Sequence, residues 1–213
     1  PNSEAEIDVG NAGTAARFIT ALVSLRNGGN YLLDSDNAMY ARPIKGLIDA
    51  LKSQGAAFEF LGERDRFPFR IRTCGLRGGT AEIDAGESSQ MLSGLLMASV
   101  CAQSPMEVRL SGGTVSKPFV KMTIEMMREF GFSCETDGNV YKPALKKGVV
   151  QSPRVYRIEP DATAASYLAT LPIAVGGVSE IRNFGACKLQ GDAAYIDVLK
   201  SMGLVETRTV GDN

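Results

Sequence analysis

Histidine is absent from the 213-residue sequence. Without an imidazole the chain cannot form a Ser-His-Asp or Cys-His catalytic group, a zinc site built on histidine, or a histidine general acid or base. Tryptophan is absent as well, so a platform that stacks a ligand on an indole ring is excluded. Any chemistry must therefore use Lys, Arg, carboxylates, hydroxyls and backbone dipoles.

Cysteines are few and lie far apart. Because no two of them form a CxxC pair, the paired motifs of zinc and redox sites are missing. Isolated cysteines with mostly apolar neighbours are typical of reduced thiols in a protein core, which favours a cytoplasmic location. The four are Cys74, Cys101, Cys134 and Cys187.

An excess of charge and a long apolar run are also missing. Lys and Arg number 23 against 24 Asp and Glu, and the net charge of −1 argues against a nucleic-acid partner, which requires a basic surplus. The longest mostly apolar run, 91–102, falls short of the roughly 18 residues of a membrane-spanning helix. We expect a globular protein without a membrane or nucleic-acid partner.

The sequence repeats itself with a period of about 75 residues. Three similar segments set this period, and Ala15, Ser89 and Ala164 occupy equivalent positions in them, 74 and 75 residues apart. A fixed period indicates that each copy folds as one supersecondary unit. Helical apolar spacing and a terminal glycine recur in each copy, predicting amphipathic helices at 43–55, 118–131 and 191–203.

Runs with strand character separate the helices. We expect strands at 30–34, 58–61, 69–72, 106–110 and 178–183, a hairpin turn at 137–139 and a further strand that begins near Val205. Each copy then has the order β-α-β-α-β-β, and the third ends inside its repeat. The first helices of the copies, at 14–25 and 88–102, are apolar on nearly every face, which is typical of helices buried among other helices. The predicted class is α/β, with buried helices surrounded by mixed sheets.

Small, polar, glycine-containing turns precede the buried helices, at 8–14 and 84–90, and a related turn lies at 160–163. Free N–H groups and the helix dipole favour an anion at such a position, and glycine lets a ligand approach the backbone closely. Arg42 and Lys117, at matching positions of two copies, could add positive charge. Alternatively the turns are only N-caps and the cations only solvated side chains. We favour this second interpretation for the turn at 160–163.

Five motifs, taken in order and spacing, resemble the 5-enolpyruvylshikimate-3-phosphate synthases over nearly the whole chain. The Asn-Ala-Gly-Thr-Ala turn is the most specific of them. The sister family of UDP-N-acetylglucosamine enolpyruvyl transferases shares the repeat fold but not these motifs, so it is the second alternative. The motifs are Asn11-Ala12-Gly13-Thr14-Ala15-Ala16-Arg17, Arg42-Pro43-Ile44, Ser88-Ser89-Gln90, Ser116-Lys117-Pro118 and Gln190-Gly191-Asp192.

The resemblance implies an inside-out α/β barrel and an enzyme that joins phosphoenolpyruvate to the 5-hydroxyl of shikimate 3-phosphate and releases phosphate, without metal or organic cofactor. Both expected ligands are anions, which agrees with the helix-end argument. Motif matches assign shikimate 3-phosphate to Ser88, Ser89, Gln90, Ser116 and Phe119, the last in place of the family's usual Tyr. They assign phosphoenolpyruvate to Asn11, Gly13, Thr14 and Arg42. A side chain at Gly13 would crowd the analogue glyphosate.

The family has two lobes of three repeats each, so the resemblance places two repeats of one lobe at 1–155 and one repeat of the other at 156–213. The family's catalytic Lys, Asp and Glu have no counterpart in these residues, and we expect the isolated chain to be inactive while still binding shikimate 3-phosphate. Apolar sides of helices 14–25 and 160–175 should be exposed. Two further alternatives are a non-catalytic repeat scaffold and a split enzyme whose partner polypeptide supplies the remainder.

Overall fold

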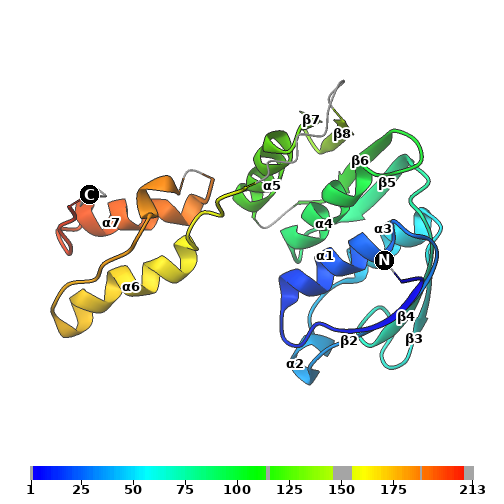
Figure 1. Cartoon of the computed structure of the whole chain (residues 1–213), viewed down its shortest axis with the longest axis horizontal. Coiled ribbons are helices and arrows are strands. Elements are labelled where there is room, and N and C mark those ends of the chain that lie inside the picture. Colours follow the sequence, from blue (N-terminus) through cyan, green and yellow to red (C-terminus); the bar gives the residue numbers. More distant parts are fainter. Residues whose placement is uncertain (1, 114–115, 146–154, 188, 209–213) are drawn as a thin grey trace. The chain divides into compact units, whose positions relative to one another are not determined.

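The computed structural model describes residues 2–113, 116–145, 155–187 and 189–208. They belong to two compact units, Pro1–Ser152 and Pro153–Asn213, and each unit is considered by itself (Figure 1). The residues just before the predicted boundary at 155, 146–154, lie outside the described part of the chain. Which family repeats the two units represent remains a prediction.

The first unit contains two copies of the predicted β-α-β-α-β-β order, which is confirmed. The first copy has one addition, the short helix α2 between β2 and α3. Its elements are β1 (Glu4–Asp8), α1 (Gly13–Val23), β2 (Asn27–Asp34), α2 (Asn37–Tyr40), α3 (Lys45–Ser53), β3 (Ala57–Phe60) and β4 (Phe69–Cys74). Those of the second copy are β5 (Gly79–Asp84), α4 (Ser89–Ser99), β6 (Met106–Ser111), α5 (Lys117–Glu129), β7 (Phe132–Asp137) and β8 (Val140–Leu145).

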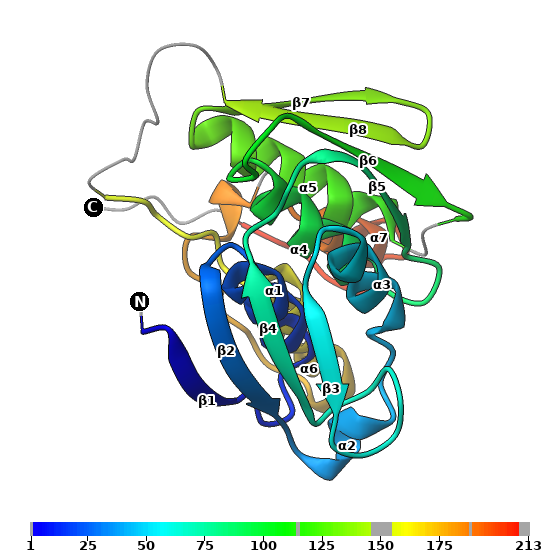
Figure 2. The ribbon, with the colours of Figure 1, turned by 90° about the vertical axis from the view of Figure 1, so that its right-hand side faces the viewer.

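The two copies also share their sheet topology. The strand orders are β1-β2-β4-β3 and β5-β6-β8-β7 (Figure 2). In each sheet the first pair is parallel and the others are antiparallel. The parallel pairs end alike, with Asp8 opposite Asp34 in one sheet and Asp84 opposite Ser111 in the other. The repeat in the sequence is therefore a repeat in three dimensions.

Helix α4 is the buried helix that its composition predicts. Every residue from Ser89 to Ser99 is buried except Gln90 and Met97. Helix α1 is buried on one face only, and its Leu22 is 62% exposed. The expectation of a buried helix is thus confirmed for α4 and holds for one side of α1.

The second unit departs from the prediction. It contains α6 (Ala162–Val175), two 3-10 turns at Phe184–Ala186 and Gly191–Ala194, and α7 (Tyr195–Ser201), but no strand within its described residues. The strand predicted at 178–183 is wrong: this segment is irregular and ends in a turn at Asn183, whose φ is 57°. A strand requires a neighbour for its backbone groups, and none is present here.

The predicted helix at 191–203 is divided into the turn Gly191–Ala194 and α7. The strand expected from Val205 is also wrong as far as residue 208, and 209–213 lie outside the described residues. Helix α6 buries only Ala162 and Ala165, whereas Tyr167 is 74% exposed. The predicted apolar exposure is therefore confirmed here, as it is at Leu22. None of the described helices is long and apolar enough to cross a membrane.

The two copies of the first unit meet where α3 packs against β5. A Cβ built on Gly46 of α3 would lie 1.9 Å from the backbone oxygen of Asp84, so no side chain fits between the helix and the strand. This close approach explains a glycine inside a helix, where glycine is intrinsically unfavourable.

We expect Gly46→Ala to lower the free energy of unfolding by about 2 kcal/mol or more, although alanine is the better helix former, because overpacking forces the backbones apart. Gly113→Ala is the control, since a Cβ there meets nothing within 4 Å. Urea unfolding followed by circular dichroism measures both variants. A Gly46→Ala variant as stable as the parent chain would contradict the contact.

Candidate functional site

Helices α1 and α4 run parallel and begin side by side. The Gln90 amide nitrogen donates to Thr14 Oγ1 at 2.8 Å, which joins their first turns. One turn further on, Gly94 lies against the backbone of Arg17. Because both contacts keep the same order along the helices, the free N–H groups at the two helix starts point toward the same side.

Arg17 fixes the start of a third helix to these two. Its Nη1 donates to the Gly13 carbonyl at 2.9 Å and to Gln90 Oε1 at 3.3 Å, and its Nη2 donates to the Pro43 carbonyl just before α3. The residue is only 2% exposed, and its Nε has no hydrogen-bond partner. The planar guanidinium suits this role because it presents several donors in fixed directions.

Arg42 brings a second guanidinium to the same place. A Cβ built on Gly13 would lie 2.8 Å from Arg42 Cζ and 2.8 Å from Arg17 Nη1, so both cations lie against this glycine. The Arg42 side chain is exposed, and its Nη1 donates to the Met39 sulfur at 3.4 Å. Only glycine leaves room for both side chains.

The electrostatics of this position favour an anion. Burial, and then the nearby charge of Arg42, lower the pKa of Arg17 to about 10, so that Arg17 is still cationic at neutral pH. The N-cap of α1 is Ala12, which offers no side-chain acceptor to the free N–H groups. Two like charges beside an uncapped helix start leave a positive potential that a bound anion would relieve.

The start of α4 combines a cap with a free hydroxyl. Ser88 Oγ accepts from the Gln90 backbone N–H at 3.3 Å, so the capping interpretation is correct for this residue. Ser89 is buried, yet its hydroxyl makes no hydrogen bond to any described residue. Ser89 is therefore the side chain of this turn that remains available to a ligand.

The remaining predicted site residues are not tied into this cluster. Ser116 is the N-cap of α5 without a side-chain capping bond, and Phe119 is 45% exposed. Their helix is joined to α4 one turn further along, where Thr123 donates to Ser93 at 2.8 Å. Asn11 lies exposed in the turn before α1. The contacts thus bring together Gly13, Thr14, Arg42 and Gln90.

The start of α6 is closed by its own side chains. Asp161 accepts from the Ala164 N–H at 3.0 Å, and the Gln190 side-chain oxygen accepts from the Ala162 N–H at 2.9 Å. The Asp192 carboxylate accepts from the Thr163 hydroxyl. This turn is a cap, as favoured from the sequence, and its carboxylates oppose an anion.

Arg17 is the residue of this cluster that the sequence analysis left out of its site assignment. It lies inside the Asn-Ala-Gly-Thr-Ala-Ala-Arg motif and is the only charged residue of α1. A lone arginine in an apolar helix, one turn after a glycine, is the signal that could have identified it.

Comparisons with known proteins agree on one family. A family model described as EPSP synthase (3-phosphoshikimate 1-carboxyvinyltransferase) matches residues 1–213. The 3-phosphoshikimate 1-carboxyvinyltransferase of Opitutus terrae is 44% identical over 196 residues, which cover 91% of this chain and 45% of that protein. The protein of the same name from Sulfurovum sp. is 37% identical over 199 residues, covering 93% and 46%. The chain thus spans less than half the length of these relatives.

A solved EPSP synthase from Acinetobacter baumannii is similar in fold. It superposes with a TM-score of 0.60 at 23% identity and covers 79% of this chain and 36% of that chain. A second structure of the same protein gives a TM-score of 0.60 at 24% identity. At this identity the likeness supports the fold, which agrees with the predicted enolpyruvyl transferase-like class.

We expect Arg17→Lys to lower the free energy of unfolding by about 2 kcal/mol or more, because lysine keeps the buried charge but cannot reach three carbonyl oxygens at once. Arg109→Lys is the control, since the Arg109 side chain is exposed and its ion pair among the described residues is with Glu107. Urea unfolding at pH 7 compares the two variants. Equal stability of the Arg17→Lys and Arg109→Lys variants would show that the hydrogen bonds of the Arg17 guanidinium group do not hold the helix starts together.

Proposed function

The chain belongs to the EPSP synthase (3-phosphoshikimate 1-carboxyvinyltransferase) family, and from this premise we propose that it binds shikimate 3-phosphate and phosphoenolpyruvate as part of an enzyme that transfers the enolpyruvyl group. The 5-hydroxyl of shikimate 3-phosphate receives the group and phosphate is released. The proposal rests on one observation above all, the pair of guanidinium groups of Arg17 and Arg42 against Gly13 at an uncapped helix start.

Phosphoenolpyruvate is assigned to this positive position. It carries a phosphate and a carboxylate, and guanidinium groups bind both in two-pronged geometry. Arg42 is exposed and free of any ion pair within the described residues, so it can turn toward the ligand. Arg17 is committed to three carbonyl oxygens and acts through the positions of Gly13 and Gln90. Asn11 and Thr14 complete the assignment.

Shikimate 3-phosphate is assigned to the starts of α4 and α5. The free hydroxyl of Ser89 supports this, and Ser88, Gln90 and Ser116 lie in the same two turns. Phe119 offers a ring but no hydroxyl, so the ring can pack against the ligand without a hydrogen bond. Neither ligand requires a metal or an organic cofactor in this proposal.

These residues bind and orient, and none of them is proposed as the acid or base. Joining a hydroxyl to the enol carbon and releasing phosphate requires proton transfer, which carboxylates or a lysine usually perform. We assign those groups to the part of the relatives' length that this chain does not cover, supplied by the remainder of the enzyme.

The four cysteines, all free, support a cytoplasmic location.

Shikimate 3-phosphate binding tests the first half of the proposal. By isothermal titration we expect saturable binding to the chain, and Ser89→Ala should weaken it about tenfold, since a hydrogen bond to a charged group is lost. Ser201→Ala on α7 is the control, and it should leave the affinity for shikimate 3-phosphate unchanged. The absence of heat at millimolar ligand, from a chain shown to be folded by circular dichroism, would contradict the assignment.

Gly13→Ala tests the phosphoenolpyruvate position. The added methyl group would displace the Arg42 guanidinium, because Arg17 is held by three hydrogen bonds and cannot move as easily. We expect phosphoenolpyruvate, titrated in the presence of shikimate 3-phosphate, to bind about tenfold more weakly to this variant. Affinity for shikimate 3-phosphate alone should stay within about twofold. Gly113→Ala serves as the control, and equal phosphoenolpyruvate affinity in both variants would refute the placement.

Mixing tests whether the chain needs a remainder. Alone it should release no phosphate from the two substrates. Addition of the segment of the Opitutus terrae relative that the chain does not cover should restore phosphate release, and it should restore less with the Arg42→Gln chain. Rapid turnover by the chain alone would overturn the assignment of the proton-transfer groups to the remainder.

A further inference from the structure

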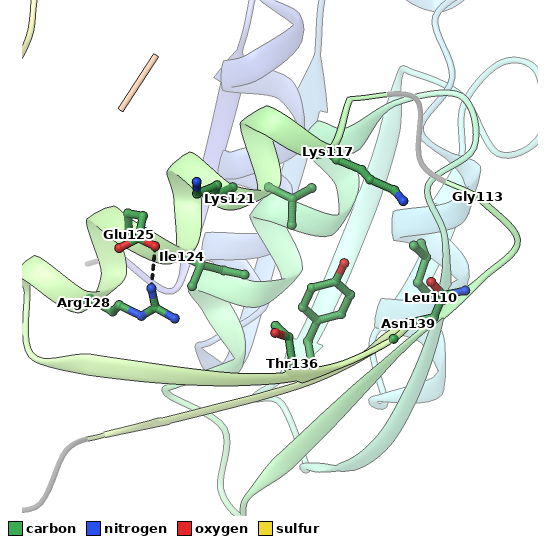
Figure 3. Close-up of a pocket in the computed structure, with 12 residues that line it drawn as sticks. Leu110, Gly113, Lys117, Lys121, Ile124, Glu125, Arg128, Thr136 and Asn139 are labelled. Carbon is green, nitrogen blue, oxygen red and sulfur yellow. Dashed lines mark hydrogen bonds and ion pairs between the residues drawn. The ribbon is translucent and has the colours of Figure 1, made fainter. Parts of the chain in front are cut away.

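A groove of about 360 Å³ lies between α5 and the β7-β8 hairpin, within the first unit. Leu110, Val120, Ile124 and Tyr141 give it an apolar lining, and Lys117 and Lys121 of α5 border it. Figure 3 shows these lysines on the helix side and Thr136 and Asn139 on the hairpin side. Its size is within the range of small-molecule sites.

The sheet register identifies the equivalent place in the first repeat. Leu33 and Leu110 each precede the last residue of the parallel pairing in their sheets. Across the sheet, Leu33 lies opposite Phe69, and the Leu110 N–H donates to the Asn139 carbonyl at 2.8 Å. Asn139 thus holds the position of Phe69.

In the first repeat, aromatic side chains fill this space. Phe67 and Phe69 are 1% and 0% exposed, and their ring centroids are 4.7 Å apart. Phe67 belongs to the connection 61–68 between β3 and β4, whereas β7 and β8 are joined by residues 138–139 alone. The second repeat therefore has no counterpart of Phe67, and the groove is the space that the two rings would fill.

The same connection also supplies a carboxylate in the first repeat. Asp65 lies 3.1 Å from Lys52 of α3, so the loop presents both an acid and a ring to its helix. When the helices are aligned on their terminal glycines, Gly55 and Gly131, Lys52 corresponds to Arg128. The hairpin of the second repeat brings no acid to α5.

Two further cations, on the first turns of α5, border the groove without an ion-pair partner among the described residues. Within the described residues Lys117 and Lys121 form no ion pair, whereas Arg128 is bound by Glu125 of its own helix (Figure 3). An apolar pocket bordered by unpaired ammonium groups complements a ligand with an apolar body and one negative charge.

We propose that this groove binds a small aromatic carboxylate, with the ring on Val120, Ile124 and Tyr141 and the carboxylate at the border of the groove, where Lys117 and Lys121 supply positive charge. The ligand ring would fill from outside the space that Phe67 fills in the first repeat, and its carboxylate would meet ammonium groups that form no ion pair with any described residue. This site does not depend on the assignment of shikimate 3-phosphate or phosphoenolpyruvate.

The probe for the test is 3-phenylpropionate, titrated into the 15N-labelled chain and followed by amide chemical shifts. We expect saturable shifts confined to residues 117–128 and 136–141, with a Kd of about 1 mM, as suits a ligand of this size. Propionate, which lacks the ring, and benzyl alcohol, which lacks the charge, should each bind at least about fivefold more weakly. Propionate binding as tightly as the probe, or no saturable shift in the folded chain, would overturn the proposal.

Variants that remove equal charge distinguish binding at the groove from non-specific electrostatic attraction to the chain. The double variant Lys117→Gln and Lys121→Gln should weaken the probe about tenfold, since the carboxylate loses its charged donors. Its control is Lys45→Gln with Lys142→Gln, which removes the same charge from lysines that pair with Asp49 and Glu107. Equal effects of the two double variants would refute the site.

Asn139→Phe tests whether the ring of the probe occupies the groove. It places an aromatic residue at the position of Phe69, and we expect it to reduce probe binding about tenfold or more while the thermal unfolding midpoint does not fall. Unchanged probe binding to this variant, once shown to be folded by its amide spectrum, would argue against a ring in the groove.

Discussion

A buried guanidinium is the constraint on which the rest of this site depends. Arg17 donates to the first residue of α1, to the first turn of α4 and to the carbonyl before α3, so three separate helix starts keep fixed positions around one cation. A charge that is 2% exposed needs hydrogen-bond acceptors, and the two terminal nitrogens of Arg17 find three of them, although Nε has none. The same bonds hold Gly13 beneath Arg42, and the positive potential at the site follows from that arrangement.

Most of the first unit could be predicted because its signals are local or periodic. Helical spacing, terminal glycines and the hairpin turn at 137–139 predicted the element order, and the contacts bring the motif residues Gly13, Thr14 and Arg42 together. The hydrogen bonds of the Arg17 guanidinium group could not be predicted, because its acceptors on Pro43 and Gln90 are distant from it in sequence. The strand predicted at 178–183 was wrong for a related reason. The composition of this segment suits a strand, but a strand forms only when a neighbouring strand pairs with it, and composition does not show whether one is present.

The helix starts show how similar turns diverge in chemistry. At α6 the turn brings Asp161, with Gln190 and Asp192 from later in the chain, and these acceptors satisfy the helix. At α1 the corresponding cap is Ala12, which accepts nothing through its side chain; Asp8 accepts from the Gly10 N–H earlier in the turn, and the side chains that lie against the first residue of the helix are Arg17 and Arg42. One repeat motif therefore yields a closed end in one copy and an anion-attracting end in another, and the difference lies in the side chains that surround the turn.

The contact between Gly46 and Asp84 has a consequence for how the first unit folds. At Gly46 the helix of one copy approaches the backbone of the next copy's strand so closely that no side chain fits between them, and both elements contribute buried apolar residues to one core. A duplicated sequence usually invites each half to melt at its own temperature. Here the shared contact couples the two copies, so we expect the first unit to unfold in one cooperative transition.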